Sequence, residues 1–280
     1  ERSGEDLTYQ HVSWEELLKS SRIPIRVVET EEDVYADMAQ TMFQQIEENN
    51  AAGKNTVLIV PVGPVGQYRI LAEWVNERKT DLSRVYFINM DEYLDEEDRP
   101  VEPAHPLSFS AFMDREWYAR VDMPRENRIF PMPGREGEIA EAIERLGGVD
   151  IAFGGIGING HIAFNEPPEA EEAISDEAFA RLPSRSLTLT RETRTINAVT
   201  AANGYIDYIP RRCVTVGMRE ILSAKKVRFY MNRTWQRGIV RKIALGPVTR
   251  LAPASFFQRH PDALLTIVSH VAEPPVGQLR

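Results

Sequence analysis

The sequence predicts an α/β protein with an open, mostly parallel sheet and helices on both faces. Short runs rich in β-branched residues are nearly continuously apolar, which is typical of strands buried on both faces of a parallel sheet. Amphipathic stretches with a helical period lie between many of these runs. Because strands and helices alternate along the chain, we expect the helices to connect the strands and to cover the sheet.

Seven strands are predicted, each from an apolar run of this kind. In chain order they are TVLIVPVG (56–63), RVYFINMDEY (84–93), VDIAFGGIG (149–157), RSLTLT (185–190), VTVGM (214–218), KVRFYM (226–231) and ALLTIV (263–268). All of them are assigned to the same α/β architecture.

The clearest helix begins after Thr30. The Thr30 side chain can cap its first turn, and Asp33 completes a capping-box-like pair. One stripe of this helix is apolar and is predicted to face the core; it consists of Val34, Met38, Met42 and Ile46. Further helices are predicted over residues 68–79, 107–121, 136–148 and 234–245.

The composition is that of an ordinary soluble globular protein. Of the 280 residues, 42% are hydrophobic and 27% are charged, which suits a sizeable α/β core. The net charge of −9 disfavours binding to nucleic acid and to anionic membrane surfaces, so neither is an expected partner. Cys213 is the only cysteine, no run approaches the ~20 apolar residues of a membrane span, and the first residues lack a secretory pattern. We therefore expect a cytoplasmic protein.

The position of the site follows from the predicted sheet. In an open α/β sheet, ligands bind outside the carboxyl ends of the strands. This rule selects three loops, which follow Val62 and Gly63, lie at residues 90–93, and span residues 155–166.

The third loop belongs to the stretch FGGIGINGHIAFNEP (153–167). Gly155, Gly157 and Gly160 have the spacing of a dinucleotide-binding fingerprint. The loop continues into HIAFNEPPE rather than into a helix, so a nicotinamide cofactor is disfavoured. No other cofactor is expected.

Acid/base chemistry fits this loop better. His161 stands at the end of the glycines, where a ligand can approach closely, and Glu166 could orient its imidazole. A metal site is disfavoured because only one histidine lies in this region. Asp91 follows the apolar run VYFIN and is predicted to project from the carboxyl end of a buried strand, where burial would raise its pKa towards that of a useful general base.

Two motifs carry a resemblance to a known family. NMDEY (89–93) and GIGINGHIAFNEP (155–167) are similar to the two signature motifs of the glucosamine-6-phosphate deaminase/isomerase family. HPLSFSAFM (105–113), TRETRTIN (190–197) and VTVGMREILSAKKV (214–227) also resemble segments of that family, so the similarity covers roughly residues 26–275.

The resemblance implies the organisation of the chain. It implies a Rossmann-like fold, a homo-oligomer, and a single domain over residues 26–280 that follows an N-terminal extension at 1–25. It also implies a possible lid at residues 167–190. The implied partner is a small sugar or sugar phosphate.

The resemblance further implies site roles without a metal or a redox cofactor. Asp91 would move a proton between C2 and C1 of the sugar, and His161 would assist ring opening. Glu166 would support His161, and Asn159 would hold it where many family members have aspartate. Abstraction of a proton next to a latent carbonyl needs a desolvated carboxylate, which suits Asp91.

The chain departs from the family at the positions that grip the sugar phosphate. The loop PVGPVGQY (61–68) has no hydroxyl, an expected lysine falls at Gln236, and an expected arginine falls near Val199. Substrate contacts are predicted at Gly63, Gly66, Gln67, Gly155, Gly157, Gly160, Gln236 and Arg237. The departures leave the C6 group open as a phosphate, another anion or a hydroxyl.

Two other functions stay open from the sequence. One is a non-catalytic sugar sensor, although the first 25 residues are too short for a helix-turn-helix module. The other is a sugar-lactone hydrolase of related fold. The presence of both NMDEY and HIAFNEP favours the isomerase/deaminase.

Overall fold

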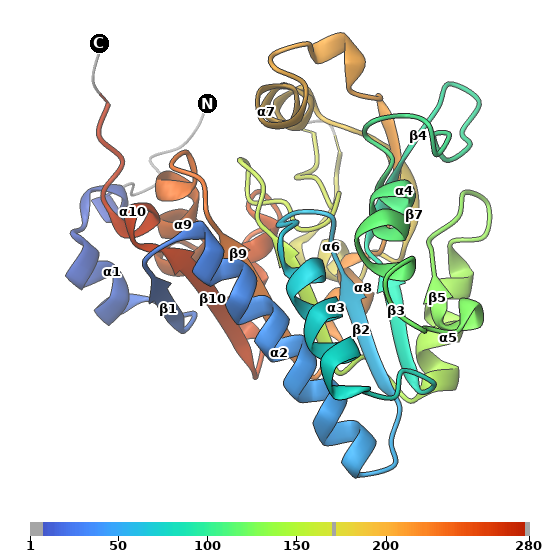
Figure 1. Ribbon diagram of the computed structural model, residues 1–280. Helices are drawn as coiled ribbons and strands as arrows, with labels where there is room; N and C mark the ends of the chain where they lie inside the picture. Colours follow the sequence, from blue (N-terminus) through green and yellow to red (C-terminus); the bar gives the residue numbers. More distant parts are fainter. Residues whose placement is uncertain (1–7, 170–171, 278–280) are drawn as a thin grey trace.

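A seven-stranded parallel sheet forms the centre of the fold (Figure 1). The computed structural model describes residues 8–169 and 172–277. The strands of this sheet are β1 (Ile25–Val28), β2 (Thr56–Val60), β3 (Val85–Asn89), β5 (Arg128–Ile129), β6 (Ile151–Gly155), β9 (Lys226–Met231) and β10 (Ala263–Val268). Their order is β1-β10-β9-β6-β2-β3-β5, and every neighbouring pair is parallel, which confirms the predicted fold class.

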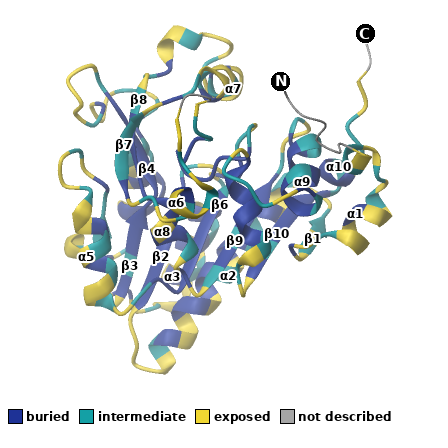
Figure 2. Ribbon diagram, turned by 180° about the vertical axis from the view of Figure 1, so that it is seen from behind, coloured by how far each residue is buried: buried dark blue, intermediate teal, exposed yellow. Residues whose placement is uncertain are grey.

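Helices cover both faces of this sheet. The α-helices of the described residues are α1 (Trp14–Ser20), α2 (Glu31–Ala51), α3 (Gln67–Arg78), α4 (Phe109–Met113), α5 (Gly137–Leu146), α6 (Asp176–Ala180), α7 (Arg191–Ala201), α8 (Met218–Leu222), α9 (Gln236–Leu245) and α10 (Ser269–Ala272). Figure 1 shows α2 and α3 in front of the sheet, and the opposite view in Figure 2 shows α6 and α8 in front of it. Across the described residues, no helix has both the length and the apolar character needed to cross a membrane.

Helix α2 confirms the prediction made from Thr30. The Thr30 side chain accepts the Asp33 N–H, and the Asp33 side chain accepts the Thr30 N–H. The predicted stripe on α2 is fully buried in the main core, where it lies among side chains of the sheet. Local capping and apolar periodicity therefore agree with the tertiary packing.

A second, smaller sheet stands at the carboxyl end of the first. Its strands are β4 (Asp91–Leu94), β8 (Arg212–Thr215) and β7 (Arg185–Thr188), which pair antiparallel in that order. A separate core supports it and consists of Tyr93, Val101, Phe164, Leu189, Ala198, Ile209 and Cys213. Helix α7 lies beside this sheet and above the end of the main one (Figure 1).

The single strand predicted over residues 84–93 is wrong at one point, because the chain changes sheets at Met90. Strand β3 ends at Asn89 and β4 begins at Asp91. The Met90 N–H donates to the Val60 carbonyl (2.9 Å), whereas its carbonyl accepts the Val216 N–H (2.8 Å). Both sheets are buried here, so the apolar pattern runs through the change without a break.

Two other predicted strands lie in the second sheet. The runs at 185–190 and 214–218 form β7 and β8, which pair antiparallel to each other rather than in the parallel sheet. The alternation of side chains has the same period in both kinds of sheet, so it cannot assign a strand to one of them.

The helix predicted over residues 107–121 is shorter than expected. Helix α4 is continued by a π-helical turn, η2 (Asp114–Tyr118). Glu116, Trp117 and Tyr118 are all buried, and the Trp117 ring stacks on Phe87 at 5.2 Å. Three consecutive buried residues do not fit one stripe of a regular α-helix.

The predicted N-terminal extension packs against the rest of the protein over its described part. Within residues 8–25, Leu17 and Ile23 are fully buried in the main core. Helix α1 and the 3-10 turn η1 (Thr8–His11) contact α9. Residues 1–7 lie outside the described part of the chain, as do 170–171 of the predicted lid and the last three residues.

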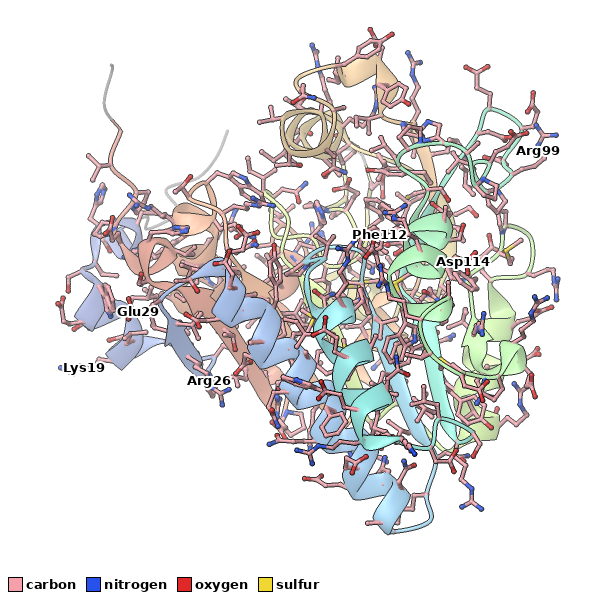
Figure 3. The ribbon with its side chains drawn as sticks, in the orientation of Figure 1. Lys19, Arg26, Glu29, Arg99, Phe112 and Asp114 are labelled. Atoms are coloured by element: carbon pink, nitrogen blue, oxygen red, sulfur yellow. The ribbon has the colours of Figure 1, made fainter. Side chains whose placement is uncertain are left out.

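Charged side chains at the outer edges lie far from the junction of the two sheets (Figure 3). Arg99, on the loop after β4, has a 68% exposed side chain and pairs with Asp95 at 2.9 Å. Lys19, Arg26 and Glu29 lie at the opposite edge of the molecule (Figure 3). These side chains therefore contribute no charge to the junction between the two sheets.

Candidate active site

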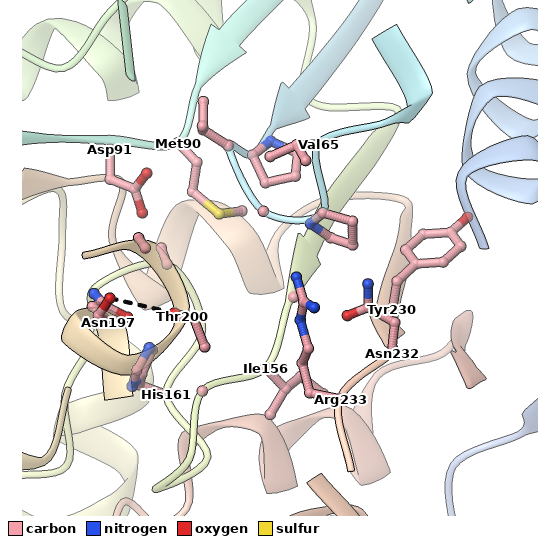
Figure 4. Close-up of a pocket in the computed structure, with 18 of the residues that line it drawn as sticks. Val65, Met90, Asp91, Ile156, His161, Asn197, Thr200, Tyr230, Asn232 and Arg233 are labelled. Carbon is pink, nitrogen blue, oxygen red and sulfur yellow. Dashed lines mark hydrogen bonds between the residues drawn. The ribbon is translucent and has the colours of Figure 1, made fainter. Parts of the chain in front are cut away.

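A cavity of about 260 Å³ opens where the two sheets meet. The three loops predicted to form the site all contribute to its lining, through residues 61–65, 90–91 and 155–157. Helix α7 and residues 230–236 complete the wall. Figure 4 shows Asp91 and His161 beside Asn197 of α7, with Arg233 and Asn232 in another part of the cavity.

Asp91 presents a buried carboxyl group without a hydrogen-bond partner. It is the first residue of β4 and is 9% exposed. Among the described residues, no N–H or O–H group donates to its carboxylate, although many buried carboxylates are stabilised in this way. Burial, together with the charge of the adjacent Glu92, raises the Asp91 pKa to about 8.

Glu92 points into a nest of backbone donors. Its carboxylate accepts N–H groups of Tyr93 (2.9 Å), Phe109 (3.0 Å) and Ser110 (2.8 Å). Burial raises the Glu92 pKa, and these backbone hydrogen bonds oppose that shift. Glu92 therefore has a structural role, because it fixes the start of α4 next to the cavity.

His161 lies at the centre of a hydrogen-bonded group of four side chains. Its Nδ1 is 2.8 Å from Asn159 Oδ1, 3.1 Å from Thr193 Oγ1 and 3.5 Å from Glu166 Oε2. Asn159 Nδ2 and the Thr193 hydroxyl both donate to Glu166 Oε2, at 3.1 Å and 3.0 Å. Burial lowers the His161 pKa, and the negative charge of Glu166 opposes that shift.

The structure thus brings together the four residues predicted as catalytic. Asp91 and His161 line the cavity, while Glu166 and Asn159 hold His161 from behind. Thr193 was not predicted. It lies outside both signature motifs, and only the position of α7 brings it to His161.

Two of the predicted glycines of the third loop line the cavity. A Cβ on Gly157 would lie 2.0 Å from His161 Cε1, and one on Gly155 would lie 3.0 Å from the Gly63 carbonyl oxygen. Gly160 does not line the cavity; it has a φ of +86° and packs against Ala252. The glycines therefore make room for the imidazole and for the turn.

The loop after β2 contributes fewer contacts than predicted. Gly63 lines the cavity, together with Pro64 and Val65. Gly66 and Gln67 lie outside the lining, because Gly66 packs against the Tyr35 ring and the buried Gln67 amide donates to the Pro64 carbonyl (2.7 Å). These two residues shape the loop from behind.

The wall formed by residues 230–236 contains one cation. Gln236 lines the cavity, but its amide is already used, donating to the Ile156 carbonyl (2.8 Å) and accepting the Arg233 N–H (2.8 Å). The predicted Arg237 lies outside the lining, where it binds the His270 carbonyl and Glu273. Arg233 takes that place instead, with its guanidinium 3.7 Å from Glu31.

Helix α7 forms the remaining wall. Asn197, Thr200 and Ala201 line the cavity, and Asn197 Nδ2 donates to the Tyr93 hydroxyl (2.8 Å). The described part of the predicted lid, 167–190, contributes no lining residue. Phe179 in that segment is buried against Phe256 instead, at 6.3 Å between ring centroids.

The described residues contain no group of three or more His, Cys, Asp and Glu side chains placed to hold a metal ion. The polar groups of the cavity are those of an acid/base site: an unpaired carboxyl, an oriented imidazole and one guanidinium. Such groups can transfer protons to and from a bound polyhydroxylated ligand.

Known proteins with similar sequences include named enzymes. No protein-family model matches the chain. The glucosamine-6-phosphate deaminase of Lachnoclostridium phytofermentans is 33% identical over 242 residues, which make up 84% of this chain and 95% of that protein. The glucosamine-6-phosphate deaminase of Rhodopirellula baltica is 30% identical over 257 residues, or 88% and 93% of the two chains.

Solved structures with a similar fold include a glucosamine-6-phosphate deaminase and a 6-phosphogluconolactonase. A structure described as a monomeric glucosamine-6-phosphate deaminase has a TM-score of 0.76 at 25% identity and covers 89% of this chain and 98% of its own. A 6-phosphogluconolactonase from Plasmodium vivax has a TM-score of 0.64 at 16% identity, covering 93% and 98%, and this likeness shows the fold alone. Since a relative at 33% identity aligns with most of both chains, this chain belongs to the glucosamine-6-phosphate deaminase family.

Proposed function

We propose that this protein is an aldose–ketose isomerase and deaminase that acts on an amino-sugar phosphate. The observation that carries the proposal is the shared cavity of Asp91 and His161. An unpaired carboxyl with a pKa of about 8 and an oriented neutral imidazole are the two groups that the reaction requires. The relatives named above as deaminases support the same reaction.

Ring opening is assigned to His161. Its Nε2 takes the proton from the O1 hydroxyl and delivers a proton to the ring oxygen O5, while the C1–O5 bond breaks and the C1 carbonyl forms. The imidazole ends the step as it began. Burial lowers the pKa of His161 and favours the neutral form that this proton shuttle needs.

Isomerisation is assigned to Asp91. Its carboxylate takes the proton from C2 of the open sugar and returns it to C1, while O1 gains the proton that the C2 ammonium group loses, so that the double bond moves from C1–O1 to C2–N. Water then adds to the resulting imine at C2 and ammonia leaves, which yields the ketose. A desolvated carboxylate is a stronger base than one in water, and the burial of Asp91 supplies this property.

These proton transfers use no electron carrier and no Lewis acid, so we propose that the reaction is independent of metal and redox cofactors. Turnover should be unchanged after dialysis against a chelator. Activity that is lost on dialysis and restored by a divalent cation would contradict this part of the proposal.

The end of the substrate away from C1 is assigned to Arg233. It is the only Lys or Arg side chain among the described residues that line the cavity, and it stands apart from Asp91 and His161 in Figure 4. A phosphate or another anion on C6 would find its charge partner there. Glucosamine 6-phosphate is therefore the first substrate to test.

The decisive experiment measures ammonia and ketose together. The protein is incubated with glucosamine 6-phosphate, with glucosamine and with an amino sugar that carries a carboxylate at C6. The proposal expects equal amounts of ammonia and ketose from at least one of them, and no product with Asp91→Asn. Consumption of a sugar lactone without ketose formation would favour lactone hydrolysis instead, and binding without turnover would favour a sugar sensor.

The assembly and domain organisation are also proposals. The resemblance implies a homo-oligomer with one domain over residues 26–280, whereas the solved relative is described as monomeric. Light scattering of the purified protein gives its mass directly. A mass near 31.8 kDa, that of one chain, would contradict the homo-oligomer.

A further inference from the structure

Thr193 occupies a buried position between the Glu166 carboxylate and the His161 imidazole. It is fully buried in the first turn of α7, whose N-cap residue is Thr190. Its Oγ1 lies 3.0 Å from Glu166 Oε2 and 3.1 Å from His161 Nδ1. Glu166 also accepts the Thr190 N–H through Oε1 (3.2 Å), so this carboxylate anchors the start of the helix.

The direction of each hydrogen bond follows from a count of protons. A carboxylate accepts only, so the single hydroxyl proton of Thr193 goes to Glu166. The oxygen of Thr193 then faces His161 Nδ1 with a lone pair. Asn159 also presents an acceptor to His161. Its Nδ2 donates to Glu166, so its Oδ1 is the atom that faces His161 Nδ1.

All groups around His161 Nδ1 are therefore acceptors. Two of them are within 3.1 Å, and Glu166 Oε2 follows at 3.5 Å. Only a protonated Nδ1 satisfies them, and in a neutral imidazole this leaves Nε2 without a proton. The imidazole lines the cavity, so a bare Nε2 is ready to take the O1 proton of a sugar.

We propose that Thr193 is a positioning residue, which holds His161 in the Nδ1–H tautomer and ties that histidine to helix α7. Its effect on turnover rests on the proposed function. Thr193 orients the proton acceptor, while residues 197, 200 and 201 of the same helix line the cavity. The Thr193 hydroxyl therefore links the protonation of His161 to the placement of this cavity wall, and Asn159 supports the same tautomer from the other side.

The test compares Thr193→Val with Thr193→Ser. Valine keeps the shape and removes both hydrogen bonds, whereas serine keeps the hydroxyl. We expect Thr193→Val to lower kcat about tenfold with KM changed less than twofold, and Thr193→Ser to stay within threefold of the natural protein. Thr195→Val is the matched control, because Thr195 is exposed on the same helix and outside the cavity lining, with its hydroxyl bonded to the Arg191 carbonyl.

A second readout does not depend on turnover. Nitrogen NMR of the protein labelled in histidine, with His161 assigned through His161→Gln, reports which ring nitrogen carries the proton. We expect Nδ1–H and a bare Nε2 in the natural protein, and a mixture of tautomers in Thr193→Val. If Thr193→Val does not fold, Thr193→Ala and the spectrum of the natural protein take its place.

Three results would overturn the proposal. The first is an Nε2–H tautomer in the natural protein, and the second is an unchanged kcat and tautomer in Thr193→Val. The third is a loss of activity in Thr193→Ser as severe as in Thr193→Val. If the natural protein turned over no amino sugar, the proposed function would fail, while the spectrum would still decide the tautomer.

Discussion

Asp91 and Glu92 are neighbours in the chain, yet backbone N–H groups bind only the carboxylate of Glu92. Three N–H groups stabilise the charge of Glu92, and none of the described residues does so for Asp91. The two side chains point to opposite sides of β4, as alternation in a strand requires. One carboxyl is therefore structural, and the other keeps a raised pKa beside the cavity.

The raised pKa predicts a pH dependence of activity. Asp91 acts as a base only when ionised, and with a pKa of about 8 roughly a tenth of it is ionised at pH 7. We expect kcat/KM to rise about tenfold between pH 7 and pH 9. Stopped assays of ammonia release across this range measure the effect.

Glu92 supplies a control for this pH dependence. Its negative charge contributes to the raised pKa of Asp91, so Glu92→Gln should move the rise in kcat/KM to lower pH. A profile that stayed in place would mean that another group controls it.

The raised pKa of Asp91 also makes the stability of the protein depend on pH. The slope has the opposite sign to that from an aspartate whose pKa is lowered by folding. Between pH 4 and pH 8 the unfolded chain has lost the Asp91 proton while the folded chain retains it, so the free energy of unfolding falls as pH rises. Asp91→Asn has no such dependence. The free energy of unfolding of Asp91→Asn should therefore exceed that of the natural protein by an amount that grows between pH 4 and pH 8 to the order of a few kcal/mol.

Denaturant unfolding at pH 5, 7 and 9 measures this difference. Asp95→Asn is the control, because hydrogen bonds from Arg99 and Glu97 lower the pKa of Asp95, so its substitution should not stabilise the protein as pH rises. An advantage of Asp91→Asn that stayed constant from pH 5 to pH 9 would show that the Asp91 carboxyl is not perturbed.

Gly157 provides a steric test of the histidine position. A Cβ there would overlap the imidazole at 2.0 Å, so Gly157→Ala has to displace His161 from the Asn159–Thr193 network. We expect kcat to fall at least a hundredfold, since small displacements of catalytic groups cost about that much. Gly137→Ala is the matched control because its Cβ would meet nothing within 4 Å, and it should keep full activity.

The sequence placed Asp91 and His161 at the cavity more accurately than it placed the proposed substrate contacts, for a physical reason. Asp91 follows the buried strand β3 and His161 lies in the loop after β6, and the carboxyl ends of parallel strands converge on one edge. Asn197 lines the same cavity and Thr193 contacts His161 behind it; both lie on α7, which follows a strand of the second sheet. Apolar periodicity does not show that the second sheet exists, so it could not place that helix.

The arginine that lines the cavity was also not predicted from the sequence. The sequence placed a substrate contact at Arg237, but the cavity is lined by Arg233, which precedes the first residue of α9. Four residues are about one helical turn, and the local pattern does not fix where the helix begins relative to the cavity. Arg233 is held at the cavity wall just before α9 by its N–H, which donates to the Gln236 side chain (2.8 Å).

These two arginines can be separated by their effect on KM. Arg233→Ala should raise KM for an amino sugar with an anionic C6 group and leave kcat within a few fold, because Arg233 stands apart from the reacting carbons. Arg237→Ala should leave KM unchanged. Glu31→Gln should lower KM, since it removes the carboxylate that lies 3.7 Å from Arg233.

Glucosamine, which carries a hydroxyl rather than an anion at C6, is the control substrate for this comparison. Its KM should respond to neither Arg233→Ala nor Glu31→Gln. Equal effects on the sugars with and without an anionic C6 group would assign Arg233 to the shape of the cavity rather than to the C6 group.

Arg241 on α9 binds two segments that are far apart in the sequence, one at Val12 and the other at Ala272 and Glu273. It is fully buried, and its guanidinium donates to the carbonyls of Val12 (3.1 Å), Ala272 (2.7 Å) and Glu273 (2.9 Å). Burial lowers its pKa, and carbonyl acceptors rather than a carboxylate surround the charge.

Arg241→Met fills similar space but leaves those carbonyls without a donor, so we expect the free energy of unfolding to fall by ~3 kcal/mol. Lys242→Met, the adjacent substitution, should change it by less than ~0.5 kcal/mol. Because none of these groups lines the cavity, kcat of the folded Arg241→Met protein should stay within twofold of the natural value. Equal stability of the two variants in denaturant would show that the N-terminal segment and the C-terminal segment are held by apolar packing alone.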